Sequence, residues 1–393
     1  MDITIQPGKL SGTIQAIPSK SQAHRLLICA AFADQPTMLI CPETNRDIEA
    51  TADCLNAIGA NIRRTAEGYS VEPVSQIPEK AELDCCESGS TLRFMLPIVG
   101  ALGVDATIHM AGRLPLRPLS PLWEEMERMG CSLFRPTDTT IRCTGKLMSG
   151  EYTIAGNVSS QFITGLLFAA SLVNGDSHIR ITGKLESAPY VTMTRQAMAQ
   201  FDVDTTDYHV IGGRRYHSPG QLTVEGDWSN GAFWLAAKAL GSDLQVTNLS
   251  PNSAQGDRLA AAHLKALERY TVIDAAQTPD LVPILAVVAG AKSGAKFINC
   301  ARLRLKETDR LTTTAAMILN LGGEADFQDD TLYIAGTGYR GGTVDALNDH
   351  RIAMSAAIAA TVCTDPVTVH NAHEVKKSYP GFWEDYKKLG GSI

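Results

Sequence analysis

The sequence predicts an α/β protein with two domains, each built from three copies of one repeating unit. A chain of 393 residues is too long for one ordinary hydrophobic core. One pattern recurs along the chain: a few polar residues, about a dozen small and apolar residues, then a run of β-forming residues. Successive copies start 68, 71, 69, 51 and 69 residues apart, at Lys20, Ser88, Ser159, Trp228, Pro279 and Asn348. The fourth unit is therefore expected to be shorter than the others.

Each βαβαββ-like unit is predicted to contain a strand, a buried helix, a second strand and a more charged, exposed helix, closed by a short strand pair. The buried helices are expected at 25–32, 92–102, 162–173, 232–240, 281–289 and 352–362. The strands that follow them are expected at 37–40, 106–110, 178–181, 244–246, 295–298 and 367–369. The exposed helices are expected at 46–59, 119–129, 191–200, 256–269, 308–321 and 382–389. Residues 61–64 and 69–71 exemplify the closing pair.

The last unit runs out of chain before its closing strands. Residues 3–5 and 12–14 alternate like strands and have no helix of their own, so we expect both to complete that unit. The polypeptide would then start in the C-terminal domain, cross to the N-terminal domain to build three units, and cross back near 212–215, where glycine and charge accumulate. The predicted N-terminal domain is 15–214, and the predicted C-terminal domain is 1–14 together with 215–393.

Composition excludes several classes of function. The net charge of −7 and the pI near 5.7 give no general attraction to nucleic acid or to an anionic membrane. The nine cysteines form no CxxC pair and have no histidine at zinc-ligand spacing, so we expect reduced, mostly buried thiols and no metal site. We see neither a secretory signal nor an apolar run long enough for a membrane helix. These observations favour a cytoplasmic protein.

The densest charge lies at 305–310, where Lys306, Glu307 and Arg310 precede an amphipathic run. Thr308 is the expected N-cap, and the spacing of Lys306 and Arg310 would place them on one helix face. Basic side chains beside exposed helix N–H groups form an anion site, and a carboxylate among them can exchange a proton. The competing interpretation is a solvated helix end with local salt bridges.

The other unusual polar residues gather at the N-terminal ends of the predicted buried helices. These ends carry unpaired N–H groups and the positive pole of the helix dipole, which suit phosphate or carboxylate. The residues concerned are Lys20, Ser21 and Arg25, then 88–91, 159–161, Asp280, and His350 with Arg351. Helix ends that converge across a cleft would make a cationic pocket in an acidic protein.

Nine short segments along this repeat occur together in a recognisable order. They are PSKS at 18–21 with Arg25, SGSTLR at 88–93, LRP at 116–118, SSQ at 159–161, SAPY at 187–190, PD at 279–280, LKETDR at 305–310, NDHR at 348–351 and KSYP at 377–380. Together they resemble the 3-phosphoshikimate 1-carboxyvinyltransferase, or EPSP synthase, family. The resemblance implies a two-domain, inside-out α/β barrel fold that closes on its substrates.

The resemblance also implies a reaction. The family transfers the enolpyruvyl group of phosphoenolpyruvate to the 5-hydroxyl of shikimate 3-phosphate and releases phosphate, on the route to chorismate and the aromatic amino acids. It implies addition and elimination through a tetrahedral intermediate in a closed interdomain cleft, where water cannot compete as the acceptor. No cofactor or metal is implied, and we expect a monomer that binds only these small molecules.

The resemblance further implies roles for individual residues. The catalytic residues would be Lys20, Asp280 and Glu307. Shikimate 3-phosphate would be held by Lys20, Ser21, Arg25, Ser159, Ser160, Gln161, Ser187, Tyr190, Asp280 and Lys306. Phosphoenolpyruvate would be held by Lys20, Gly89, Arg117, Gln161, Arg310, Arg351 and Lys377. Arginine forks suit carboxylate and phosphate oxygens, and glycine lets the backbone approach closely. The sequence has Glu87 and His24 where asparagine is common among relatives, and Phe94 where some relatives have proline.

Three of the residues also have a structural interpretation, and the whole sequence has rival functional ones. Asp280 could instead cap the helix that begins at Leu281, Lys20 could be an ordinary solvated lysine, and His350 could be a helix cap. One rival function is the UDP-N-acetylglucosamine enolpyruvyl transferase, but its reactive cysteine has no counterpart in 114–121. Another is a non-catalytic repeat protein that binds phosphorylated ligands, which would not need paired carboxylates. A nucleotide kinase is disfavoured because the phosphate-binding GxxxxGK[ST] loop is missing from the sequence.

Overall fold

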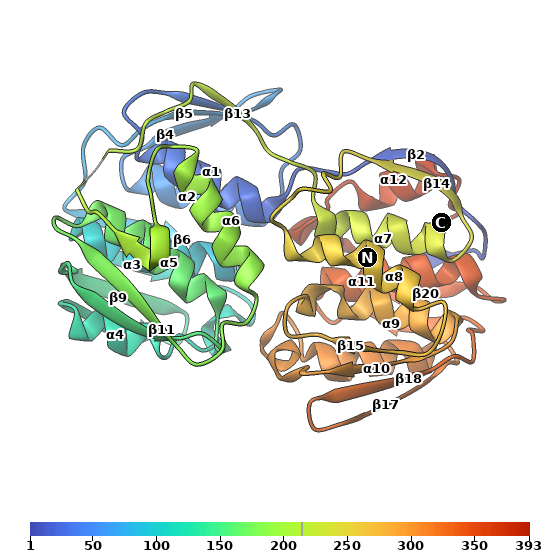
Figure 1. Ribbon diagram of the computed structural model, residues 1–393. Helices are drawn as coiled ribbons and strands as arrows, with labels where there is room; N and C mark the ends of the chain where they lie inside the picture. The colour runs from blue at the N-terminus through green and yellow to red at the C-terminus, as the bar shows by residue number, and fades with distance from the viewer. Residues whose placement is uncertain (214) are drawn as a thin grey trace. The chain divides into compact units, whose positions relative to one another are not determined.

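The computed structural model describes residues 1–213 and 215–393 (Figure 1). These residues form two compact units, an N-terminal unit of Lys20–Val224 and a C-terminal unit of Met1–Ser19 with Glu225–Ile393. Each unit has its own cluster of buried apolar side chains. Helices and strands alternate in both, which confirms the predicted α/β class. The predicted division at 214/215 stays a prediction, and Arg214 lies outside the described residues.

The N-terminal unit contains three sheets with one common plan. In spatial order the strands are β13 (Gln221–Thr223), β3 (Thr37–Ile40), β5 (Gly68–Glu72) and β4 (Asn61–Arg64); β6 (Lys80–Asp84), β7 (Asp105–His109), β9 (Thr140–Gly145) and β8 (Cys131–Thr137); and β10 (Glu151–Ala155), β11 (Ser177–Thr182) and β12 (His209–Val210). In each sheet the first two strands pair in parallel and the later pairs are antiparallel. This shared order is the structural form of the sequence repeat.

The helices of the N-terminal unit fall into two groups. The helices at the predicted buried positions are α1 (Lys20–Ala31), α3 (Gly89–Leu102) and α5 (Ser160–Leu172), and most of their residues are buried. The more exposed helices are α2 (Arg46–Ala57), α4 (Leu122–Arg128) and α6 (Ala188–Ala199). Short 3-10 turns lie at η1 (Leu114–Leu116) and η2 (Thr206–Tyr208).

The C-terminal unit repeats this plan with one reduced sheet. Its sheets are β14 (Asp243–Thr247) with β2 (Ser11–Gln15); β15 (Thr271–Asp274), β16 (Ala295–Ile298), β18 (Thr331–Ala335) and β17 (Glu324–Gln328); and β19 (Gly342–Asp345), β20 (Val367–His370) and β1 (Ile3–Ile5). The buried helices are α7 (Trp228–Ala239), α9 (Val282–Ala291) and α11 (His350–Ala359). The others are α8 (Ala260–Ala266), α10 (Arg310–Asn320) and α12 (Phe382–Lys388), with 3-10 turns η3 (Gly256–Leu259), η4 (Pro279–Leu281), η5 (Ala301–Leu305), η6 (Ala360–Val362) and η7 (Ala372–Lys377).

The N-terminal strands confirm one prediction and correct another. Ile3 pairs with Val369, so β1 completes the last sheet as expected. The prediction for residues 12–14 was wrong, because β2 pairs in parallel with β14. Elsewhere, the strand before a buried helix pairs in parallel with the strand after it, as β6 and β7 do around α3. By this rule β2, which precedes α1, would pair with β3, and β13, which precedes α7, would pair with β14. The two strands are exchanged: β13 pairs with β3, and β2 pairs with β14.

The fourth unit is shorter, as predicted, because α8 is followed directly by β15 of the next sheet. The closing strand pair expected in every unit was wrong for the third, fourth and sixth units, and in the part of the chain that the structure describes the sixth sheet has the single closing strand β1. Within residues 1–213 and 215–393, the third sheet has the single closing strand β12, and the fourth sheet contains only β14 and β2.

A glycine explains how closely helices α3 and α5 pack against each other. Pro97 lies inside α3 and has no N–H group for the carbonyl of Arg93, four residues earlier. Gly165 of α5 packs over this point, where a Cβ atom would lie 2.2 Å from the Arg93 carbonyl oxygen. The missing side chain therefore lets the two helices approach each other.

Candidate active site

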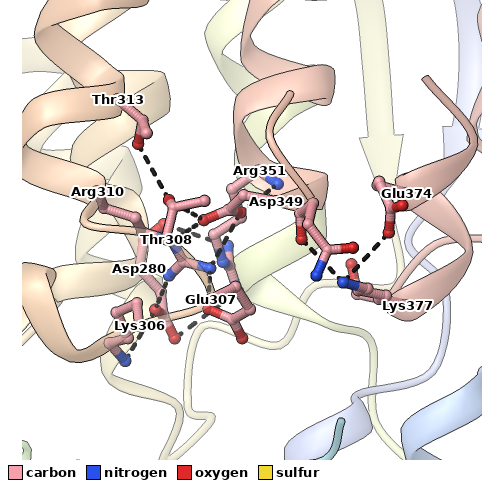
Figure 2. Close-up of polar contacts among 12 residues, drawn as sticks. Asp280, Lys306, Glu307, Thr308, Arg310, Thr313, Asp349, Arg351, Glu374 and Lys377 are labelled. Atoms are coloured by element: carbon pink, nitrogen blue, oxygen red, sulfur yellow. Dashed lines mark hydrogen bonds and ion pairs between the residues drawn. The ribbon is translucent and has the colours of Figure 1, made fainter. Parts of the chain in front are cut away.

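Arg310 is the centre of a buried cluster of charges in the C-terminal unit (Figure 2). Its Nη1 donates to Asp280 Oδ1 at 2.6 Å, and its Nη2 donates to Glu307 Oε2 at 2.6 Å. Its Nε donates to Asp349 Oδ2 at 2.7 Å. Burial alone would lower the pKa of Arg310, but these three carboxylates raise it above its usual value. The side chain is only 1% exposed, so the competing interpretation of a solvated helix end is wrong.

Asp280 is the carboxylate on which the cations converge. Besides Arg310, it contacts Lys306 Nζ at 3.1 Å and Arg351 Nη2 at 3.7 Å. Burial alone would raise the pKa of Asp280, but Lys306, Arg351 and Arg310 lower it well below its usual range. Asp280 does not cap a helix, since it lies within η4 and the cap position of α9 is Leu281.

Lys306 and Arg310 meet through Asp280 and not through helical spacing. Helix α10 begins at Arg310, and Lys306 precedes it with an extended backbone. The predicted N-cap, Thr308, was wrong because Asp309 accepts hydrogen bonds from the N–H groups of Leu311 and Thr312. The Thr308 hydroxyl instead donates to Asp349 Oδ2 at 3.1 Å. The charged residues at 305–310 are therefore held by tertiary contacts, which the rules for helix capping and helical spacing do not predict.

Asp349 is the residue of this cluster that our sequence analysis missed. It is fully buried, caps α11 by accepting from the Arg351 N–H at 2.9 Å, and contacts Arg310. Its position just before a buried apolar helix is a capping signal that could have identified it. His350 is the first residue of α11 and not its cap, so that alternative was wrong.

Lys377 lies in η7 of the same unit, with different partners. Its ammonium group donates to the Asn348 carbonyl oxygen at 2.8 Å and pairs with Glu374 at 3.2 Å. Because residue 348 directly precedes the capping Asp349, this bond ties Lys377 to the start of α11 (Figure 2).

In the N-terminal unit, the predicted site residue Arg25 is almost fully buried. Its guanidinium donates to Thr194 Oγ1 at 2.8 Å, to the Ser21 carbonyl at 2.6 Å and to the Tyr190 carbonyl at 3.0 Å. Burial lowers the pKa of Arg25 to about 10, so it remains cationic at neutral pH. These bonds join the start of α1 to α6.

Lys20 begins α1 and pairs with Asp47 Oδ2 of α2 at 2.8 Å. Both side chains are 17% exposed, so Lys20 is not the freely solvated lysine of the local alternative. Lys20 is the first residue of α1, and the N-terminal end of a helix favours the binding of an anion.

Two further helix ends carry the remaining predicted residues of this unit. Gln161 Nε2 donates to Ser90 Oγ at 2.9 Å and so connects α5 to α3. A Cβ atom at Gly89 would lie 2.6 Å from Nη1 of both Arg117 and Arg93, so a larger residue there would require these guanidinium groups to move. Ser159 caps α5, Ser160 is buried in its first turn, and Ser187, with φ near 53°, precedes α6. Gly89, Ser159, Ser160, Gln161 and Ser187 thus lie at the starts of α3, α5 and α6.

Comparison with solved structures defines the class of protein. The EPSP synthase of Acinetobacter baumannii matches with a TM-score of 0.81 at 21% identity, covering 99% of this chain and 98% of that one. The enolpyruvyl transferase NikO of Streptomyces tendae matches with a TM-score of 0.76 at 18% identity, covering 99% and 97%. The chain therefore has the enolpyruvyl transferase fold.

Sequence comparison defines the family. The family model described as EPSP synthase (3-phosphoshikimate 1-carboxyvinyltransferase) matches residues 5–386. The 3-phosphoshikimate 1-carboxyvinyltransferases of Clostridium kluyveri and Clostridium perfringens are each 38% identical, covering the whole chain and 98% and 99% of those proteins. The chain belongs to the EPSP synthase family, which confirms the resemblance found in the sequence.

Two other sequence expectations can be compared with the structure. All nine cysteines are free, and all but Cys86 are buried, as predicted. Across residues 1–213 and 215–393, no helix combines the length and the apolar character that crossing a membrane requires.

Proposed function

We propose that the chain transfers the enolpyruvyl group of phosphoenolpyruvate to the 5-hydroxyl of shikimate 3-phosphate, with release of phosphate. Family membership supports this reaction over that of the UDP-N-acetylglucosamine enolpyruvyl transferase. The observation that carries the residue assignment is the cluster of Asp280, Glu307, Lys306, Arg310 and Arg351, where carboxylates that can move protons lie among cations that suit anionic substrates.

The reaction needs three proton movements. A proton is added to the methylene carbon of phosphoenolpyruvate while the attacking hydroxyl loses one, and the resulting methyl group then loses a proton as phosphate leaves the tetrahedral adduct, which restores the double bond. We assign proton exchange at the methylene carbon to Glu307 and removal of the hydroxyl proton to Asp280. The lowered pKa of Asp280 keeps it ionised, as a proton acceptor requires. Lys20, already paired with Asp47, is assigned to stabilise the anionic groups and to relay a proton.

The remaining assignments follow substrate charge. Arg310, Arg351, Lys377, Arg117 and the Gly89 backbone are assigned to phosphoenolpyruvate, with Gln161 and Lys20 serving both substrates. Shikimate 3-phosphate is assigned to Ser21, Arg25, Ser159, Ser160, Ser187, Tyr190, Lys306 and Asp280. Arg310 already donates to three carboxylates, so binding a substrate carboxylate requires it to exchange or share one of these contacts.

The proposal extends to the setting in which the enzyme works. We place it in the cytoplasm as a monomer that takes only these two small substrates. The acidic pI of about 5.7 supports the exclusion of nucleic acid and anionic membrane as partners.

The test is an assay of phosphate release from phosphoenolpyruvate with either of two acceptors. We expect release with shikimate 3-phosphate and none with UDP-N-acetylglucosamine. Release that occurs only with the UDP-sugar would contradict the proposal, and tight binding of shikimate 3-phosphate without any release would indicate a non-catalytic binding protein.

A further inference from the structure

A chain of buried hydrogen bonds in the N-terminal unit has no role in the assignments above. It joins His24 of α1, Thr51 of α2, and Thr91 and Ser88 at the start of α3, and all four side chains are fully buried. His24 Nδ1 lies 2.7 Å from Thr51 Oγ1, which lies 2.7 Å from Thr91 Oγ1. Thr91 Oγ1 in turn lies 2.7 Å from Ser88 Oγ.

The direction of these bonds can be deduced from the last one. The Thr91 hydroxyl donates to Ser88 Oγ, and a hydroxyl group has only one hydrogen. Thr91 must therefore accept from Thr51, and Thr51 must accept from Nδ1 of His24. Nδ1 of His24 therefore carries a hydrogen. Burial, followed by the nearby charges of Lys20 and Arg25, lowers the pKa of His24 well below its usual value, which favours a neutral ring.

Both ends of this series of hydrogen bonds lie close in sequence to residues of the proposed site. His24 stands one helical turn after Lys20 on α1. Ser88 is the N-cap of α3, accepts from the Thr91 N–H at 3.2 Å, and directly precedes Gly89. The Thr91 oxygen also lies 3.4 Å from the carbonyl oxygen of Asp47, whose carboxylate pairs with Lys20, but its one hydrogen is directed to the nearer Ser88 Oγ.

We propose that His24, Thr51 and Thr91 are positioning residues that fix the distance between Lys20 and the Gly89 backbone in the phosphoenolpyruvate subsite. The inference rests on the proposed function, because that function assigns both residues to this substrate. The physical reason is that each hydroxyl is buried and has a defined donor and acceptor, so the three helix segments cannot shift without leaving a polar group unpaired. His24 also packs edge-on against Phe94 of α3, at 6.3 Å between ring centroids, which holds the imidazole in place.

The test compares two substitutions of similar size at one position. Thr51→Val keeps the shape of the side chain and removes the hydroxyl, whereas Thr51→Ser keeps the hydroxyl and removes a methyl group. Both changes are expected to lower the thermal midpoint, because one leaves a polar partner unsatisfied and the other leaves a small cavity. We expect Thr51→Val to raise the KM for phosphoenolpyruvate about 10-fold or more, in line with the cost of misplacing substrate-binding groups, and Thr51→Ser to retain the wild-type KM.

The outcomes separate this inference from the proposed function. Equal KM values in the two variants would overturn the positioning role, whether both match the wild type or both rise together. If Thr51→Val does not fold, the pair Thr91→Val and Thr91→Ser makes the same comparison one bond further along the chain. A wild-type protein that releases no phosphate in the presence of shikimate 3-phosphate would refute the proposed function itself, independently of any variant.

Discussion

Arg310 shows how a single side chain can organise a site. A buried guanidinium opposed by three carboxylates has little freedom to move, and removing any one partner leaves a charge in a region of low dielectric. Lys306 and Arg351 add positive charge around Asp280, so the cluster combines both signs at short range. Removing these charges from water costs free energy that their mutual attraction barely offsets, so the cluster contributes little to the stability of the fold. This favours a functional reason for its presence.

The first prediction concerns Glu307. Glutamine at this position can still accept the hydrogen bond from Arg310 Nη2, so the geometry and substrate binding should persist. It cannot give or take the proton at the methylene carbon, and we expect turnover to fall by about 10² to 10⁴-fold. Steady-state phosphate release and calorimetric titration with shikimate 3-phosphate measure the two properties. Glu324→Gln, at an exposed position of β17, is the control, and wild-type turnover in Glu307→Gln would remove this residue from the mechanism.

The second prediction concerns Asp257, which is 1% exposed and accepts a hydrogen bond from Ser229. Burial and the charge of Asp280 raise the pKa of Asp257 to about 6, against about 3.9 in an unfolded chain. A raised folded-state pKa stabilises the fold below the unfolded pKa, and this stabilisation is lost as the pH rises through about 6.

Asp257→Asn has no proton to lose, so its stability should improve relative to the wild type between pH 4 and pH 7. The expected change is on the order of 2 kcal/mol. Thermal midpoints of both proteins, measured at several pH values across this range, provide the comparison. A difference that stays constant with pH would show that Asp257 titrates alike in the folded and unfolded states.

At the scale of secondary structure, the close contact of α3 and α5 gives the third prediction. Gly165→Ala places a methyl group 2.2 Å from the Arg93 carbonyl oxygen, and the helices must separate to admit it. We expect a loss of about 1–3 kcal/mol and a lower thermal midpoint. Gly8→Ala is the control, because no heavy atom lies within 4 Å of the added methyl group. A Gly165→Ala midpoint equal to that of Gly8→Ala would contradict this account of the packing.

The elements that sequence predicted well are those with a strong local signal. Helix α9 is apolar on every side and buried at all but its last position, so its pattern sufficed. Pattern failed where tertiary contacts decide the outcome. Thr308 has the composition of an N-cap, but its hydroxyl donates to Asp349, and Asp309 takes the capping role. The capping role of Asp349 has a local signal, but its contact with Arg310 has none, because the two residues are 39 positions apart in the sequence.

At the scale of the whole molecule, the chain passes twice between its two compact units. Strand β2, which precedes α1, belongs to a sheet of the C-terminal unit, and β13, which precedes α7, belongs to a sheet of the N-terminal unit. Each passage thus follows a strand that is hydrogen-bonded in the unit the chain is leaving. The sixfold repeat was visible in the sequence, but this exchange was not, because parallel pairing of distant strands leaves no local pattern.

The central claim is that the reaction proceeds by addition and elimination with a proton delivered to the methylene carbon. Running it in D₂O and measuring the mass of the enolpyruvyl product tests this most directly. Addition converts the methylene group to a methyl group that carries one deuterium, and elimination removes any of its three hydrogens, so deuterium should appear in the product. A product made entirely in D₂O that contains no carbon-bound deuterium would contradict the mechanism.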